Sequence, residues 1–261
     1  TLAQIVIRAP KMELIVNSQI FVTSYSNGLF VFNTKNKTWK QFTYGSNMLT
    51  KIAAISDNEL LIATVDGLVL FNTKTKKFTQ SYLETKSTTT QTSFKDFAQI
   101  DKTHWYVSST KGIYIFNKQD GLKPAFVFKK GNEESDYLGT IYTSIVYNEN
   151  LYLGTNQGLF YRNIKSKDAF QLIKNTRGQV WSLTQIDGAL FCGHDSGTFW
   201  IKKNQAKQIF DKQGTWNLKR INDSTILQGC YDGLYVLEKK NQTWVLKNKI
   251  RGFENSSKDV V

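Results

Sequence analysis

Three aspartates recur just before a glycine that marks a repeated segment, and a pair of carboxylates is what hydrolysis of a glycosidic bond requires. They are Asp66, Asp195 and Asp232. No Gly-x-Ser-x-Gly elbow, Walker sequence or Cys-x-x-Cys pair accompanies them. Asp is also favoured in tight turns, where its side chain bonds nearby backbone N–H groups. We therefore expect a non-catalytic chain, with a polysaccharide lyase or hydrolase as the less favoured alternative.

The two histidines, His104 and His194, fall in different repeats, so the sequence predicts no shared metal site and no cofactor. His104 is expected near the face opposite the candidate site. His194 and Asp195 lie together in a turn and are candidates for ligand binding. Alignment of the repeats places three further candidates in the equivalent turns of neighbouring repeats, namely Asn156, Tyr231 and Asp232.

Aromatic residues near the start of three predicted strands suggest a different chemistry. Tyr142, Trp181 and Trp216 occupy these positions, and Arg177 precedes Trp181 in the connection NTRGQV. A flat ring suits a sugar face, and an arginine fork suits a carboxylate or sulfate. We expect Trp216 to pack in the core. Trp181 with Arg177 is the main predicted site, and Tyr142 is added to the ligand-binding candidates.

The elements that must position these residues come from a repeat. Six times a small residue, three variable residues and a glycine lead into a short apolar strand, with 36 to 46 residues between successive glycines. This period is expected of propeller blades. The marker glycines are Gly28, Gly67, Gly112, Gly158, Gly197 and Gly233.

Each repeat is predicted to hold four strands. The residue four positions before each marker glycine is always Ser, Ala or Gly, as a crowded strand near a propeller axis requires, and turn pairs such as Asn17-Ser18 and Asp187-Gly188 separate the first two strands. We predict an all-β fold, a β-propeller with six complete four-stranded blades, and leave a seven-bladed ring or a longer array open. One domain is expected over residues 1–261. It comprises an incomplete strand at 1–10, six repeats over about 11–250, and the start of a further unit at 251–261.

The chain carries 34 Lys and Arg against 21 Asp and Glu, a net charge of +13. The lysines gather in the turns between third and fourth strands, which lack the aromatics on which bases stack, so a nucleic-acid partner is disfavoured. An acidic glycan, an anionic membrane surface or an acidic partner protein stays open. No apolar run reaches the ~18 residues of a membrane helix, so no membrane insertion by this region is expected. Enlarged connections at 85–93 and 129–137 are further binding candidates.

The two cysteines, Cys192 and Cys230, project from the same side of equivalent strands in successive repeats. Two side chains that both point in the same rotational direction do not meet, so we predict free thiols.

The segment LYLGTNQGLFYRN from Leu151 resembles the two-component regulator propeller repeat, and ATVDGLVLFN from Ala63 and SSTKGIYIFN from Ser108 match it more loosely. Tyr152 stands where the family commonly has tryptophan, and the fifth and sixth repeats lack its Gly-Thr pair. In that family such repeats build periplasmic sensor propellers of membrane-bound histidine kinases and related regulators, chiefly in Bacteroidetes. Many of them respond to polysaccharide fragments.

The resemblance implies an extracytoplasmic, periplasmic sensor propeller without catalytic activity. It implies an oligosaccharide ligand, which can be neutral or acidic. It also implies that adjacent propeller or signalling domains belong to the same longer chain and that the protein forms a homodimer. The alternative is a scaffold for protein–protein interaction that binds no small ligand.

Overall fold

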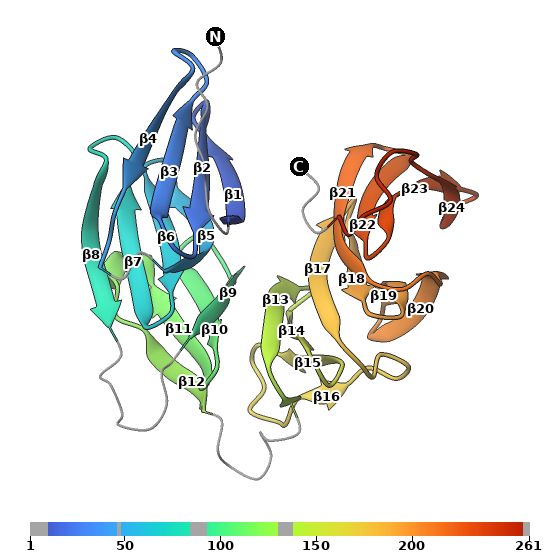
Figure 1. The fold of residues 1–261 in the computed structure, drawn as a ribbon. Coiled ribbons are helices and arrows are strands. Elements are labelled where there is room, and N and C mark those ends of the chain that lie inside the picture. The colour runs from blue at the N-terminus through green and yellow to red at the C-terminus, as the bar shows by residue number, and fades with distance from the viewer. Residues whose placement is uncertain (1–9, 46–47, 84–92, 130–137, 258–261) are drawn as a thin grey trace. The chain divides into compact units, whose positions relative to one another are not determined.

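The computed structural model describes residues 10–45, 48–83, 93–129 and 138–257. Over these residues the chain forms six four-stranded antiparallel sheets, whose strands Figure 1 labels, and one short 3-10 helix, η1 (Lys118–Asp120). Every sheet takes its four strands in sequence order, as propeller blades do. The predicted fold class, all-β with six complete four-stranded blades, is confirmed.

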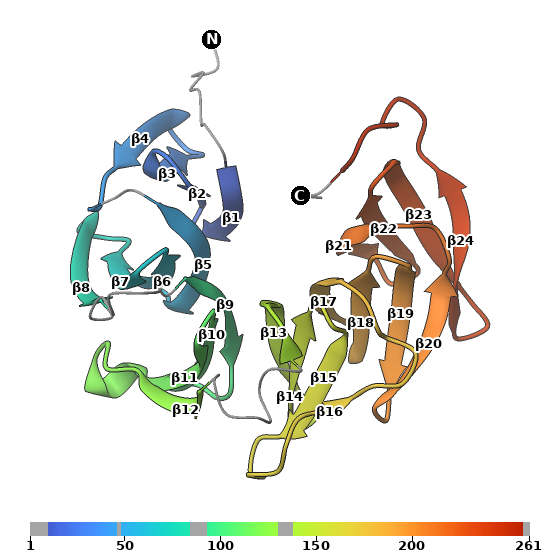
Figure 2. The ribbon, with the colours of Figure 1, turned by 60° about the horizontal axis from the view of Figure 1, so that its bottom comes forward.

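The chain divides into two compact units, Thr1–Lys130 and Gly131–Val261, each with three blades. The first unit contains β1 (Pro10–Val16), β2 (Gln19–Ser24), β3 (Gly28–Asn33) and β4 (Thr38–Phe42), then β5 (Leu49–Ser56), β6 (Glu59–Thr64), β7 (Gly67–Asn72) and β8 (Lys77–Leu83), then β9 (Phe94–Gln99), β10 (His104–Ser109), β11 (Gly112–Asn117) and β12 (Ala125–Lys129). Within this unit the first strands β1, β5 and β9 are neighbours (Figure 2).

The second unit repeats this arrangement, with β13, β17 and β21 as its neighbouring first strands (Figure 2). It contains β13 (Ile141–Tyr147), β14 (Asn150–Thr155), β15 (Leu159–Asn163) and β16 (Gln171–Leu172), then β17 (Val180–Ile186), β18 (Ala189–His194), β19 (Gly197–Lys202) and β20 (Gln205–Phe210), then β21 (Thr215–Asn222), β22 (Thr225–Cys230), β23 (Gly233–Lys240) and β24 (Thr243–Lys249). The predicted single domain and the incomplete strand at 1–10 stay predictions, since residues 1–9 lie outside the described part. Most of the enlarged connections 85–93 and 129–137 lies outside it as well.

The small residue four positions before each marker glycine lies in the second strand of its blade, and all six are buried. Adjacent blades explain the restriction. A Cβ on Gly154 would lie 2.5 Å from a methyl group of Val180, and one on Gly193 would lie 2.6 Å from the Thr215 carbonyl oxygen. Val180 and Thr215 begin the first strand of the following blade, so the sheets can approach each other only where the side chain is small.

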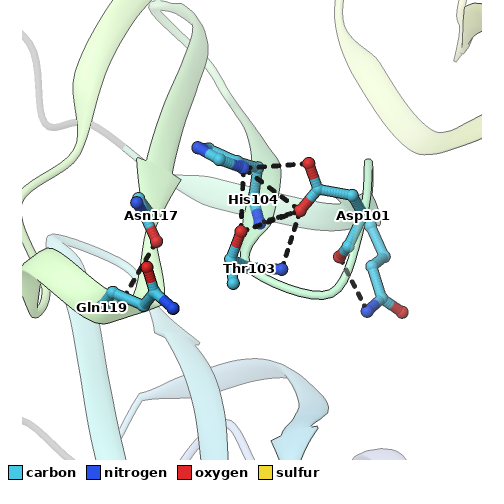
Figure 3. Close-up of polar contacts among 6 residues, drawn as sticks. Asp101, Thr103, His104, Asn117 and Gln119 are labelled. Atoms are coloured by element: carbon cyan, nitrogen blue, oxygen red, sulfur yellow. Dashed lines mark hydrogen bonds and ion pairs between the residues drawn. The ribbon is translucent and has the colours of Figure 1, made fainter.

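An asparagine ends the third strand in four blades, at positions 33, 72, 117 and 163. Its side-chain oxygen accepts a backbone N–H two residues later, from Lys35, Lys74, Gln119 and Lys165 respectively; Figure 3 shows the bond from Asn117 to Gln119. These turns direct the chain into the fourth strand and leave the neighbouring lysines at the surface. They account for the lysine-rich turns predicted from the repeat.

A β-bulge interrupts the pairing of the first and second strands near the start of every blade. One residue of the first strand has no opposite partner, because a bulge inserts an extra residue that turns its side chain out of the regular alternation. In the second unit the bulged residues are Tyr142, Trp181 and Trp216. The equivalent residues of the first unit are Lys11, Thr50 and Lys95, so the aromatic series belongs to the second unit.

Both cysteines are buried free thiols, as predicted. The Sγ of Cys230 lies 3.7 Å from the Thr215 hydroxyl and accepts a hydrogen bond from the Gln228 amide at 3.5 Å. Burial raises the pKa of Cys230 to about 11 and raises that of Cys192 as well. Neither thiol is therefore a reactive thiolate at neutral pH.

Candidate ligand-binding site

Four aromatic side chains of the second unit follow one another in contact and define what we call the aromatic row: Tyr142, Trp181, Trp216 and Tyr231. Ring centroids are 5.4 Å apart for Tyr142 and Trp181, 4.5 Å for the two tryptophans, and 5.0 Å for Trp216 and Tyr231. Neighbouring ring planes are tilted by 41° to 50°. All four side chains are partly exposed, so the row offers apolar ring surface to solvent.

The repeat places these rings together. The first three are the bulged residues of successive first strands β13, β17 and β21, and those strands are neighbours. Tyr231 comes from the turn that follows β22 in the last blade. Since each bulge occurs at the same point of its blade, equivalent side chains emerge at the same end of adjacent strands.

Hydrogen bonds fix the orientation of the rings. The indole N–H of Trp181 donates to the Tyr231 hydroxyl at 2.9 Å, and that hydroxyl donates to Asp195 Oδ1 at 2.7 Å. The indole N–H of Trp216 donates to the Ser256 hydroxyl at 3.0 Å. Burial, reinforced by the Asp195 carboxylate, raises the pKa of Tyr231 to about 12, so its hydroxyl keeps its proton as a donor at neutral pH.

The backbone of the connection between β20 and β21 packs against the Tyr231 ring. Gly214 has φ of 73°, and a Cβ built there would overlap the Tyr231 ring. The Gly214 N–H also donates to the Asp195 carbonyl at 2.7 Å. A glycine is required at this position because the connection between β20 and β21 runs directly against the aromatic ring.

Among the residues predicted from sequence, the structure brings together Tyr142, Trp181, Asp195 and Tyr231. Trp216, expected to pack in the core, is instead a partly exposed member of the row. Gln179 was not predicted, and its side-chain amide lies 3.0 Å from the Tyr142 hydroxyl. The sequence could have indicated Gln179, because it lies in the connection directly before β17, two residues from Trp181.

His194 does not belong to the site, which corrects the prediction. Its side chain is 2% exposed, because the last residue of β18 points into the packed layer and meets Phe199 edge-on at 5.3 Å. Its Nδ1 accepts the Ser196 backbone N–H at 2.9 Å, and its Nε2 lies 3.3 Å from the Thr176 carbonyl. The imidazole therefore ties the turn after β18 to the connection before β17.

The burial of His194 gives a pH-dependent stability. Desolvation lowers its pKa, although the Thr176 carbonyl and the Asp195 charge oppose the shift. The unfolded chain then takes up a proton more readily, so stability is complete above the ordinary histidine pKa of ~6.5 and falls below it, by at most ~1.4 kcal/mol per pH unit. Urea unfolding between pH 7.5 and 5 should show this loss, and His194→Gln should flatten it. An unchanged slope in the variant would assign the effect to other groups.

Two further candidates, Asp232 and Asn156, bond to other parts of their own blades instead of joining the row. Asp232 pairs with Lys249 at 2.8 Å and accepts from the Tyr235 hydroxyl at 2.7 Å. Burial opposes its ionisation, but these two hydrogen bonds outweigh it and lower the pKa of Asp232. The Asn156 side chain accepts the Thr140 backbone N–H at 2.6 Å, so it links the turn after β14 to the connection before β13.

Arg177 is exposed in the connection between β16 and β17, and among the described residues we find no hydrogen bond or ion pair to its guanidinium. The pairing of Arg177 with Trp181 in one site therefore stays a prediction.

His104 is the first residue of β10, at the opposite end of its blade from the turn before the marker glycine, as predicted. Figure 3 shows that the Asp101 carboxylate accepts the backbone N–H groups of Thr103 and His104, at 2.7 and 2.8 Å, and meets the His104 ring at 2.9 Å. The two backbone bonds are the main cause of a lowered pKa of Asp101. This cluster is a side-chain-closed turn. Across residues 10–45, 48–83, 93–129 and 138–257, no group of three or more metal-ligating side chains occurs.

Comparison with solved structures identifies the fold. The chain aligns over 95% of its length, with a TM-score of 0.71 and 19% identity, with the extracellular domain of the putative hybrid two-component system BT4673 from B. thetaiotaomicron, of which it covers 34%. A second structure of that domain, described as a one-component system, aligns over 93% with a TM-score of 0.71, 21% identity and 33% of that chain covered. The chain shares its fold with about a third of this extracellular domain. No protein-family model and no curated protein sequence matches it.

A third similar structure is PorZ, an essential bacterial surface component of the type-IX secretion system of Porphyromonas gingivalis. It aligns over 90% of the chain with a TM-score of 0.64 and 14% identity, and 31% of PorZ is covered. The chain thus spans about a third of the length of the chain in each of these three structures, two of which are of the same BT4673 domain. The two-component regulator propeller resemblance noted in the sequence agrees with the BT4673 alignments. A search of the described residues for a helix long and apolar enough to cross a membrane finds none.

Proposed function

We propose that the chain is a non-catalytic, ligand-binding part of an extracytoplasmic sensor, and that the aromatic row binds an oligosaccharide. The row itself is the observation that carries this proposal. Four partly exposed rings, two of them tryptophans, meet at the same end of neighbouring strands. The shared fold with the BT4673 extracellular domain supports a place in a sensing protein.

The physical case rests on preorganisation. The C–H face of a sugar ring packs on a flat aromatic ring, and the tilt of successive rings suits successive units of a twisted glycan chain. Because Trp181 and Trp216 are already held by ring contacts and by hydrogen bonds to Tyr231 and Ser256, binding requires little further ordering of side chains.

Signalling requires more than binding. A ligand shifts a conformational equilibrium only if it binds two states with different affinity. In the proposed protein those states are two arrangements of this domain against an adjacent propeller or signalling domain, or against a second copy in a homodimer. The periplasm is the compartment that this function implies.

A second candidate function, a scaffold for a protein partner, has one observation in its favour. Ile221 and Phe253 of the last blade and its following segment are 57% and 53% exposed. A protein that covers these side chains would bind without any response to a glycan.

Thermal unfolding with a ligand panel tests the proposal. The panel contains neutral and acidic oligosaccharides, a heparin-like polyanion and a DNA duplex, each at low and high salt. A ligand at ~100 times its dissociation constant adds ~2.7 kcal/mol to stability. We expect a salt-resistant shift with an oligosaccharide. A shift only with polyanions that disappears in salt would assign binding to the lysine charge, and no shift at all would favour the protein scaffold.

A further inference from the structure

Three of the four ring hydrogen-bond donors of the aromatic row are occupied within the protein, whereas the Tyr142 hydroxyl accepts a bond from Gln179. The Trp181 N–H is used by Tyr231, the Trp216 N–H by Ser256, and the Tyr231 O–H by Asp195. A ligand lying on these rings therefore finds neither indole N–H nor the Tyr231 proton available to hold an anionic group.

Asp195 offers the opposite chemistry. It is partly exposed, its Oδ1 accepts from Tyr231, and in the described part of the chain we find no hydrogen-bond partner for its Oδ2. An ionised carboxylate only accepts hydrogen bonds, so the free oxygen can be satisfied only by a donor from the ligand or from water. Tyr231 fixes the carboxylate beside Trp181 and Trp216, since Tyr231 contacts both of them.

We infer that the ligand of the aromatic row is a neutral oligosaccharide and that Asp195 determines this specificity. This inference rests on the proposed function. Sugar hydroxyls donate to the free oxygen while the sugar faces pack on the rings, and a charge-assisted bond of this kind is stronger than a neutral one. A uronic acid unit would instead bring a second carboxylate towards Asp195, and like charges at short range repel.

Arg177 is the residue that argues for an acidic sugar, since a free guanidinium binds carboxylates well. It lies in the connection before β17, and within the described part of the chain we find no hydrogen bond or ion pair from it to the row. If acidic sugars were the ligands, their affinity would depend on Arg177 and would not depend on the free carboxylate oxygen of Asp195. The two residues thus make opposite predictions about the charge of the ligand.

Calorimetric titration with matched oligosaccharides separates these cases. The probes are tetrasaccharide pairs of one linkage, galactose with galacturonate, mannose with mannuronate and glucose with glucuronate. The wild-type chain should bind the neutral member of a pair at least ~10-fold more tightly than its uronate. Asp195→Asn keeps an acceptor for Tyr231 but replaces the free carboxylate oxygen with an amide donor. It should therefore weaken binding of the neutral sugar and reduce the ratio of the uronate dissociation constant to the neutral dissociation constant about 10-fold.

Two further variants complete the test. Asp211→Asn removes an equal charge from an exposed side chain in the connection after β20, and it should leave the ratio unchanged. Arg177→Gln tests the acidic-sugar alternative, because tight binding of a uronate that this variant abolishes would overturn the inference. A uronate that binds as well as its neutral partner, or a ratio that Asp195→Asn does not alter, would overturn the inference while the proposed function stands. If no probe bound the wild-type chain, both would fail together.

Discussion

Replacing Trp181 with alanine should weaken oligosaccharide binding by about 100-fold, equivalent to about 3 kcal/mol and typical of a binding hot spot. Trp181 is central in the aromatic row, in contact with Tyr142 on one side and Trp216 on the other. Its loss removes one stacking surface and also the N–H that orients the Tyr231 hydroxyl. Titration with the oligosaccharide that binds most tightly in the ligand panel, monitored by intrinsic fluorescence, measures the change in dissociation constant.

A matched control is available in the same blade. Trp200 lies on β19, is partly exposed like Trp181, and packs against the core cluster of the last two blades with Lys202 over its ring. Trp200→Ala should lower stability but leave the dissociation constant unchanged. Equal losses of binding in the two variants would mean that both act through the fold, and the aromatic row would lose its assigned role.

The architecture was predictable because each blade repeats the same short-range sequence features. Marker glycines open or directly precede the third strands. Turn pairs such as Asn17-Ser18 and Asn148-Glu149 adopt the positive φ angles of tight hairpins, and small residues occur where blades meet. Each of these features depends on residues close together in the chain. Repetition then converts six weak signals into one strong prediction.

The candidate site was predictable only in part, because it depends on contacts between blades. The sequence placed Tyr142 and Trp181 at the start of first strands, but not the bulge that turns them outwards or the contact that makes Trp216 a neighbour of Tyr231. His194 failed for a related reason. Its turn position suggested exposure, whereas strand alternation and the approach of the Thr176 carbonyl bury it.

Gly193→Val should destabilise the chain by about 3 kcal/mol or more, the upper range for overpacking a core. A Cβ there would lie 2.6 Å from the Thr215 carbonyl oxygen and closer still to the Ser182 hydroxyl. The first of these atoms is backbone of the following blade and cannot rotate away, so β18 and β21 must separate. Thermal unfolding by circular dichroism should show a fall in Tm of about 6 to 12 °C for a chain of this size.

The position of Thr215 extends the effect to the binding site. Thr215 is the first residue of β21 and directly precedes Trp216, so a shift of this strand also moves a ring of the aromatic row. Gly188→Asn is the control, because that turn has φ of 72° and open space around its Cβ, and asparagine tolerates this conformation. It should change Tm little. Comparable losses in the two variants would show that the approach of the blades at Gly193 is not what restricts this position to small residues.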